Sequence, residues 1–367
     1  MALWIGALSG LWSVGGTEGP IAWHAHEMLF GYATAALGGF VLTAVPNWTG
    51  RLPVSGLPLA VLVALWLAGR SVDLAPALLG DAVSALIDSL YLPALAFVVT
   101  REVVAGSNWQ NARVAVGLTT LAGLNIAFHA IALQSADPAI VFRATVALYV
   151  LLVCHIGGRI VPSFTRNYLA RRGATRLPAP MGWIDQAALA SALVAGLSWT
   201  VFPQAWPTLT TALVAAGLNG LRLLRWRGGA TWREPLLLVL HVGYAFVPIG
   251  YVAVALASLD LLSAASALHL LTVGVIGMMT FAVMTRATRG HTGRPLAASR
   301  MTAVSYACLA LVALLRPMAE LVASAYLALL TLSAILWIIA YGLFVVEHAP
   351  MLARPSPARV TAKTSAS

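Results

Sequence analysis

The sequence predicts an all-α, polytopic transmembrane helix bundle of about 12 helices. Of its 367 residues, 60% are hydrophobic and only 9% are charged. A soluble domain of this size could not hide so much apolar surface, so the bilayer must be its solvent. No long hydrophilic stretch interrupts the apolar segments. We therefore expect a single integral-membrane domain over residues 1–353 and a disordered cytoplasmic tail over residues 354–367.

Twelve apolar segments of roughly spanning length account for the predicted helices. The first is too short to span comfortably, and we expect a truncated helix whose beginning lies upstream of Met1. The longest polar connection, 158–180, is basic and is expected in the cytoplasm. In chain order, the predicted segments are 2–15, 24–45, 57–70, 77–100, 112–134, 138–158, 182–202, 206–224, 235–257, 261–285, 299–315 and 319–346.

The positive charge of the chain follows its predicted topology. The formal net charge is +10, and alternate loops plus the C-terminal tail hold 19 of the 22 Lys and Arg residues. The opposite side has only Arg70, Arg143 and Arg316. This asymmetry is the positive-inside pattern. We therefore expect the chain in the bacterial inner membrane, with both termini in the cytoplasm. It explains the basic composition without nucleic acid as a partner.

An internal echo links two of the predicted helices. His26 precedes the Thr of "NWTGR" by 23 residues, and His269 precedes the Thr of "GHTGR" by the same distance. Gly31 and Gly274 also match in this register. Both helices run from outside to inside, so the echo predicts His26 and His269 at similar depth.

Several histidines lie in or beside the apolar segments. His24, His26, His129 and His269 are predicted near the outer side, with His155 and His241 towards the cytoplasm and His291 and His348 at its surface. Neutral imidazoles that converge in a dry bundle can bind haem iron or copper. The alternative is that each histidine only forms hydrogen bonds between helices. Because the sequence has no C-x-x-C-H motif, a haem would be held by coordination.

Acidic and basic residues near these histidines leave several roles open. Glu27 lies one helical turn after His24 and could orient it, relay protons or cap an interfacial helix. Asp81 and Asp88 share one helix face and could form a proton path or pair with Arg143. Most cytoplasmic arginines are topology anchors, but two of them could bind porphyrin propionates. These two are Arg286 and Arg294.

The chain closely resembles the NnrS family of bacterial membrane proteins. The resemblance rests on "WHAHEMLFGY…GGFVLTAVPNWTGR", "GGRIVPSFTRN", "RLLRWR…EPLLLVLHVGYAF" and "ALHLLTVGVIGMMTFAVMTRATRGHTGRPL". These blocks follow the family order over nearly the whole chain, although the aromatic lead usual at the family's first helix is absent. The resemblance implies a haem- and copper-containing protein that helps cells withstand nitric oxide, often in denitrifying bacteria. Its motif histidines here are His24, His26, His241, His269 and His291.

A further likeness concerns helix numbering. In haem–copper oxidases and their nitric-oxide-reductase relatives, twelve helices form three four-helix arcs, and helices 2 and 10 hold a bis-histidine haem. By this likeness we expect His26 and His269 to ligate a haem b. Copper candidates are then His24, His129 and His241, with Glu27, Arg286, Arg294 and His291 as outer partners of the metal sites.

The predicted function is therefore protection from nitric oxide in the membrane, by binding it, by redox chemistry or by protecting metal pools. Nitric oxide or another small ligand and an electron donor are the expected partners besides lipid. The sequence does not decide whether the protein is an enzyme. A secondary transporter of a small solute or metal complex is the main alternative, since twelve helices and a repeat also suit that class. A membrane scaffold with incidental metals is a third.

Overall fold

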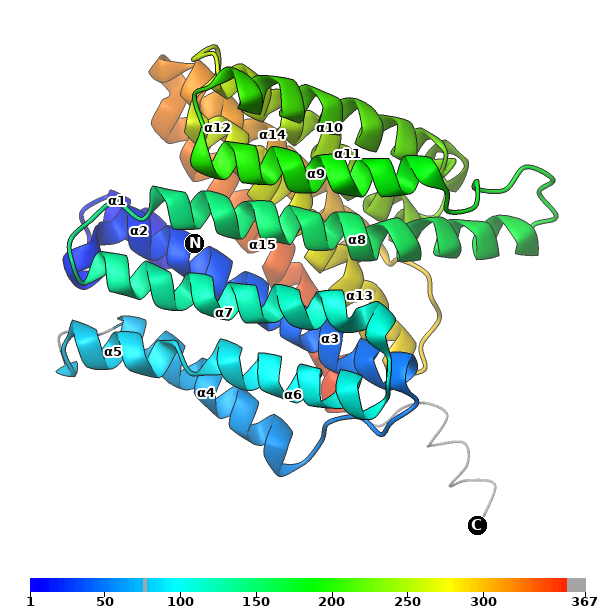
Figure 1. The fold of residues 1–367 in the computed structure, drawn as a ribbon, viewed down its shortest axis with the longest axis horizontal. Coiled ribbons are helices and arrows are strands. Elements are labelled where there is room, and N and C mark those ends of the chain that lie inside the picture. Colours follow the sequence, from blue (N-terminus) through cyan, green and yellow to red (C-terminus); the bar gives the residue numbers. More distant parts are fainter. Residues whose placement is uncertain (75–77, 355–367) are drawn as a thin grey trace. The chain divides into compact units, whose positions relative to one another are not determined.

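The computed structural model describes residues 1–74 and 78–354, and across these residues it is helical, without strands (Figure 1). Each of the twelve predicted segments contains helix, so the predicted all-α class is confirmed. Residue 77, the expected start of the fourth segment, and nearly all of the expected tail lie outside the described residues. The chain divides into two compact units, Ala2–Leu148 and Tyr149–Ser367, with Met1 assigned to the second.

The first unit is built from helices α1 to α7 and the start of α8. Helix α3 packs against α6, α6 against α7, and α4 against α5 (Figure 1). Its elements are α1 (Ala2–Leu8), η1 (Gly16–Glu18), α2 (Gly19–His26), η2 (Glu27–Tyr32), α3 (Ala33–Thr49), α4 (Leu57–Leu74), α5 (Asp81–Asp88), α6 (Tyr91–Ala105), η4 (Trp109–Asn111), α7 (Ala112–Ala132) and α8 (Ala139–Arg171), which contains the boundary between the units.

The second unit continues from α8 to α15. Helices α9 and α10 pack together, α10 packs against α11, and α14 packs against α15 along much of its length. After α8 its elements are α9 (Trp183–Val201), α10 (Trp206–Leu224), η5 (Gly228–Thr231), α11 (Pro235–Ala257), α12 (Ala264–His269), η6 (Leu270–Gly277), α13 (Met278–His291), α14 (Arg300–Leu321), η7 (Ala323–Ala325) and α15 (Tyr326–Ala353).

Ten helices among the described residues are long and apolar enough to cross a membrane. The short α1 and helix α10 are not among these ten. Helix α8 continues to Arg171, past its predicted end at residue 158, so much of the expected polar connection is helical. Pro162 lies inside this continuation without ending it. The chain is thus a multi-pass membrane protein that associates with the lipid bilayer.

The two helices that share the internal echo also share an unusual backbone. In the first unit, the turns directly after His26 form the π-helix η2 within a continuous helix from Gly19 to Thr49. In the second unit, the turns directly after His269 form the π-helix η6 within a continuous helix from Ala264 to His291. π-Helical turns are rare and are frequent at functional sites. Each echoed histidine is therefore the last α-helical residue before a π segment.

Candidate metal centre

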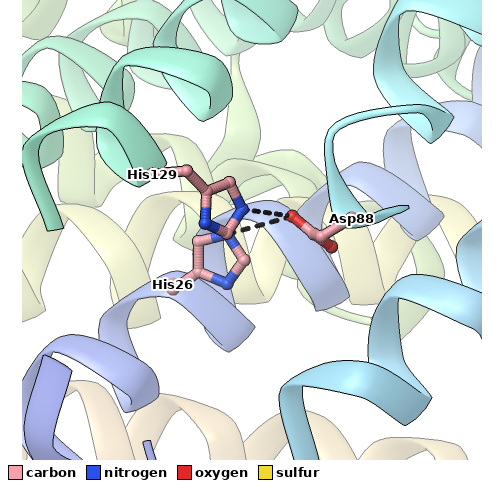
Figure 2. A group of neighbouring side chains, drawn as sticks. All are labelled: His26, Asp88 and His129. Carbon is pink, nitrogen blue, oxygen red and sulfur yellow. Dashed lines mark hydrogen bonds and ion pairs between the residues drawn. The ribbon is translucent and has the colours of Figure 1, made fainter. Parts of the chain in front are cut away.

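Two histidines and an aspartate meet in the interior of the first unit. His26 ends α2, Asp88 ends α5, and His129 lies in the last turn of α7. Figure 2 shows both imidazoles facing one carboxylate: Asp88 Oδ2 lies 2.9 Å from His129 Nε2 and 3.3 Å from His26 Nε2. All three residues are buried. One ligand atom from each lies within 4.8 Å of the others, so this group, the His–Asp–His cluster, could hold a metal ion.

Neighbouring side chains fix the orientation of the His–Asp–His cluster. Asn125 Nδ2 donates to Asp88 Oδ2 at 3.0 Å, and Asn125 Oδ1 lies 2.9 Å from His26 Nε2. The ring of Phe128 stacks on His26 at a centroid separation of 4.6 Å. An aromatic face and an amide thus limit rotation of the His26 ring. Such supporting contacts commonly orient metal-binding imidazoles.

Arg70 joins the cluster to further carboxylates. This arginine on α4 forms ion pairs with Glu27 and Asp88, and its guanidinium lies 3.2 Å from Asp73. Asp73 Oδ2 in turn lies 3.6 Å from His26 Nδ1. Gly31, in the π segment, leaves room for this pairing, because a Cβ there would crowd both Arg70 and Glu27. Glu27 therefore pairs with Arg70 across helices, a partner that the sequence reading did not propose.

Glu18 extends the network beyond the end of the membrane-spanning helix. Its carboxylate Oε1 lies 4.0 Å from His129 Nδ1. Burial raises the pKa of the Glu18 carboxyl, and nearby His26 opposes that shift. The described network then contains four carboxylates, Glu18, Glu27, Asp73 and Asp88, and one arginine, Arg70. With neutral histidines, these groups carry three more negative than positive charges.

A small cavity adjoins the cluster. Its volume is about 30 Å³, and His26, His129, Trp23 and Ser84 are among its lining residues. The indole Nε1 of Trp23 and the Oγ of Ser84 are buried, and neither has a hydrogen-bond partner among the described residues. A cavity of this size holds about one water molecule. The cavity therefore places two unused polar groups beside two candidate metal ligands.

The other predicted residues of the first unit lie around this centre in different ways. His24 stacks on Trp4 at 4.5 Å, with the rings nearly parallel, and is not one of the clustered histidines. Asp88 pairs with Arg70, a partner that the sequence did not indicate. Asp81 lines the cavity.

His241 and His269 belong to the second unit and are held separately there. His241 is buried, and its Nε2 lies 2.8 Å from Thr165 Oγ1. Its Nδ1 is buried without a hydrogen-bond partner among the described residues. His269 Nδ1 lies 2.6 Å from the carbonyl of Ala265, one turn earlier. This contact assigns the proton to Nδ1 and leaves a lone pair on Nε2, which is the tautomer that a metal-binding histidine needs.

The outer candidates of the second unit are near its basic helix ends. Arg286 lies over the ring of Phe164 at 4.1 Å, and Arg294 donates to the carbonyls of Thr292 and Met351. His291 is exposed at the end of α13. His348, expected at the surface, is instead fully buried against Phe344, because α15 continues past it to Ala353. That expectation was wrong.

The sequence reading missed Arg70, Asp73 and Asn125 as members of this network. Arg70 gave a signal, since it is one of three basic residues on the side of the membrane predicted to carry few Lys and Arg residues. It also lies in an apolar segment, where an ionisable group indicates a functional site. Asn125 is uncharged and gave no comparable signal. The structure also joins His26 and His129, which the sequence reading had assigned to different metals.

The fold and this network define a polytopic helical membrane protein with a buried histidine–carboxylate cluster able to hold a metal ion. Comparison with known families gives the more particular class. The NnrS protein family matches residues 1–356, and the chain belongs to this family. Membership identifies it as a membrane protein related to nitric oxide stress. No curated protein and no solved structure matches the chain.

Proposed function

We propose that this chain is a haem- and copper-binding protein of the bacterial inner membrane, with both termini in the cytoplasm, that protects against nitric oxide. The copper is assigned to His26, Asp88 and His129. The excess negative charge of the network around these residues is the observation that carries the assignment. Family membership supports the link to nitric oxide stress.

The charge argument follows from the cost of burying unpaired ions. A carboxylate away from water is stable only with a cation, a proton or several hydrogen bonds. Arg70 offsets one of the four carboxylates in the network. A divalent ion in the His–Asp–His cluster would offset two more, so the polar residues present fit a resident metal. Bound protons could balance the same charge, and metal analysis separates these two cases.

The donor set also suits the proposed metal. Imidazole binds copper well, and two histidines with one carboxylate leave further coordination positions for a small ligand. When bound, copper would supply redox chemistry and an open position for nitric oxide. The protein residues have separate tasks. Asp88 holds both imidazoles, Asn125 and Phe128 fix His26, and Arg70 fixes the Asp88 carboxylate.

The haem is assigned to His269, whose Nδ1 contact with Ala265 leaves Nε2 available for iron. The original pairing with His26 remains a hypothesis. His26 Nε2 faces Asn125 and Asp88, and its Nδ1 faces Asp73. Because His26 lies in the His–Asp–His cluster with His129, we assign it to copper. Measuring the haem and copper contents of the same His26→Ala sample separates the two roles.

The deciding experiment is metal analysis of the purified wild type, His26→Ala, His129→Ala and the control His155→Ala, which changes a histidine outside both proposed sites. Copper, iron and haem are measured on each sample, with a reduced-minus-oxidised spectrum. We expect His26→Ala and His129→Ala to lose copper and keep haem, and His155→Ala to keep both. Loss of haem in His26→Ala would support the His26–His269 pair instead. A folded wild type without copper or haem would overturn the proposed function and favour transport.

A further inference from the structure

The cavity beside the His–Asp–His cluster has features of a ligand site that the metal assignment does not use. It lies between α2, α5 and α7, the helices that supply the cluster. Its volume of about 30 Å³ excludes any organic substrate and fits water or a diatomic molecule. Because His26 and His129 line it, a molecule inside would lie next to the proposed metal. Size and position therefore restrict the occupant to a very small ligand.

Two unpaired polar groups give the cavity a specific chemistry. Trp23 is 7% exposed and Ser84 is 4% exposed, and both line the cavity. Neither Trp23 Nε1 nor Ser84 Oγ has a hydrogen-bond partner among the described residues. The indole N–H only donates, and the hydroxyl can donate as well. Leaving such buried groups unpaired is unfavourable, so an occupant that accepts hydrogen bonds is favoured.

The charge around the cavity selects among small acceptors. Glu18, Asp73 and Asp81 line it, and Asp88 lies just beyond in the cluster. These carboxylates repel an anion such as nitrite or azide. A neutral molecule does not experience this electrostatic repulsion. The cavity thus combines hydrogen-bond donors with an anionic wall, which suits a small neutral acceptor.

We propose that this cavity binds one nitric oxide molecule, in exchange with a resting water, through hydrogen bonds from Trp23 Nε1–H and Ser84 Oγ–H. The inference rests on the proposed function for the identity of the ligand. Trp23 and Ser84 are positioning residues: they hold the ligand beside His26 and His129 and do not bind the metal. Because the carboxylates around the cavity repel anions, we expect it to select nitric oxide over nitrite.

The test uses the purified full chain and the variants Trp23→Phe and Ser84→Ala. Each has a matched control at an exposed site, Trp109→Phe and Ser71→Ala. Trp109 is 66% exposed, and Ser71 is also exposed and donates to the carbonyl of Leu67 in its own helix. Metal content and thermal unfolding are measured first for all proteins. Nitric oxide is then titrated into the reduced samples, and the infrared N–O stretch is recorded. Nitrite is titrated as the anionic probe.

We expect both cavity variants to keep their metals, bind nitric oxide about 10-fold more weakly and shift the N–O stretch, with the controls unchanged. Wild type should bind nitrite far more weakly than nitric oxide. Metal-loaded cavity variants with unchanged affinity and stretch would overturn this inference and leave the proposed function intact. A metal-free wild type would overturn the proposed function. In that case the cavity is tested alone by ultraviolet Raman spectroscopy of the Trp23 indole. Subtracting the spectrum of Trp23→Phe from that of the wild type isolates the bands of this indole. If nitric oxide does not shift these bands, the inference is overturned too.

Discussion

Replacement of Asp88 by Asn distinguishes a metal-binding carboxylate from a structural one. Asn has nearly the same shape, so the change removes the negative charge and one hydrogen-bond acceptor. Arg70 keeps Glu27 and Asp73 as partners after the substitution. Because the new amide NH2 must face a donor, either Arg70 or Asn125, we expect the metal-free protein to lose about 1–3 kcal/mol of stability.

The expected loss of metal affinity is additional to this loss of stability. Two unit charges about 4 Å apart interact by about 4 kcal/mol at an effective dielectric constant of about 20, and a divalent ion doubles that value. Compensation by the remaining carboxylates reduces the loss, and we expect at least about 3 kcal/mol, which is more than about 100-fold in affinity. Titration with a competing chelator measures the affinity, and thermal unfolding in detergent measures the stability.

Asp185 provides a matched control in the second unit. It is also a buried aspartate, but it faces two arginines, Arg222 at 2.9 Å and Arg225 at 3.0 Å. Asp185→Asn leaves the buried Arg222 without its counter-ion, so we expect a loss of about 3 kcal/mol in stability and no change in metal affinity. If Asp88→Asn keeps its metal affinity, the charge argument for a metal at the His–Asp–His cluster is wrong.

Three further predictions address the two units separately. His129→Ala removes one of the three ligands, and copper content should fall while haem, measured as the pyridine haemochrome, is retained. His269→Ala should remove haem and leave copper, because the Nδ1 contact with Ala265 leaves the Nε2 lone pair for the proposed iron; retained haem would contradict the assignment. Gly158→Ala should destabilise the second unit by about 1–3 kcal/mol, because a Cβ there meets the Arg222 guanidinium, and an unchanged thermal midpoint would count against this packing.

The sequence was sufficient for the fold class because the bilayer imposes a strong length and composition pattern. A span needs about 20 apolar residues, and that pattern survives in each segment independently of its neighbours. The bounds of α11, one of the ten candidate spans, match its predicted segment for this reason. The end of α8 was missed because its last turns, up to Arg171, are polar and helical at once. Hydropathy locates the apolar part of a helix but not its polar extension.

The candidate site was harder to predict because its members come from separate helices. His26, Asp88 and His129 are brought together by packing between α2, α5 and α7, and spacing along the chain does not encode such contacts. Depth below the surface was the one coordinate that sequence could supply, and it did group His26 with His129. Depth could not identify Asp88 as their shared partner. Nor could it show that Arg70 links Asp88 to Glu27.

The two helices that share the internal echo also share a π-helical segment at the same position. Five matching residues in two helices could arise by chance, but His26 and His269 also share the same place at an α-to-π junction. A π turn inserts an extra residue, which changes the direction of every side chain after it relative to those before it. Gly31 and Gly274 lie within these segments, where each admits a neighbouring side chain, Arg70 in the first unit and Phe246 in the second. A glycine within a π-helical segment therefore adjoins a charged network in the first unit and an apolar side chain in the second. This contrast is consistent with a charge-balancing copper at His26 and a haem at His269.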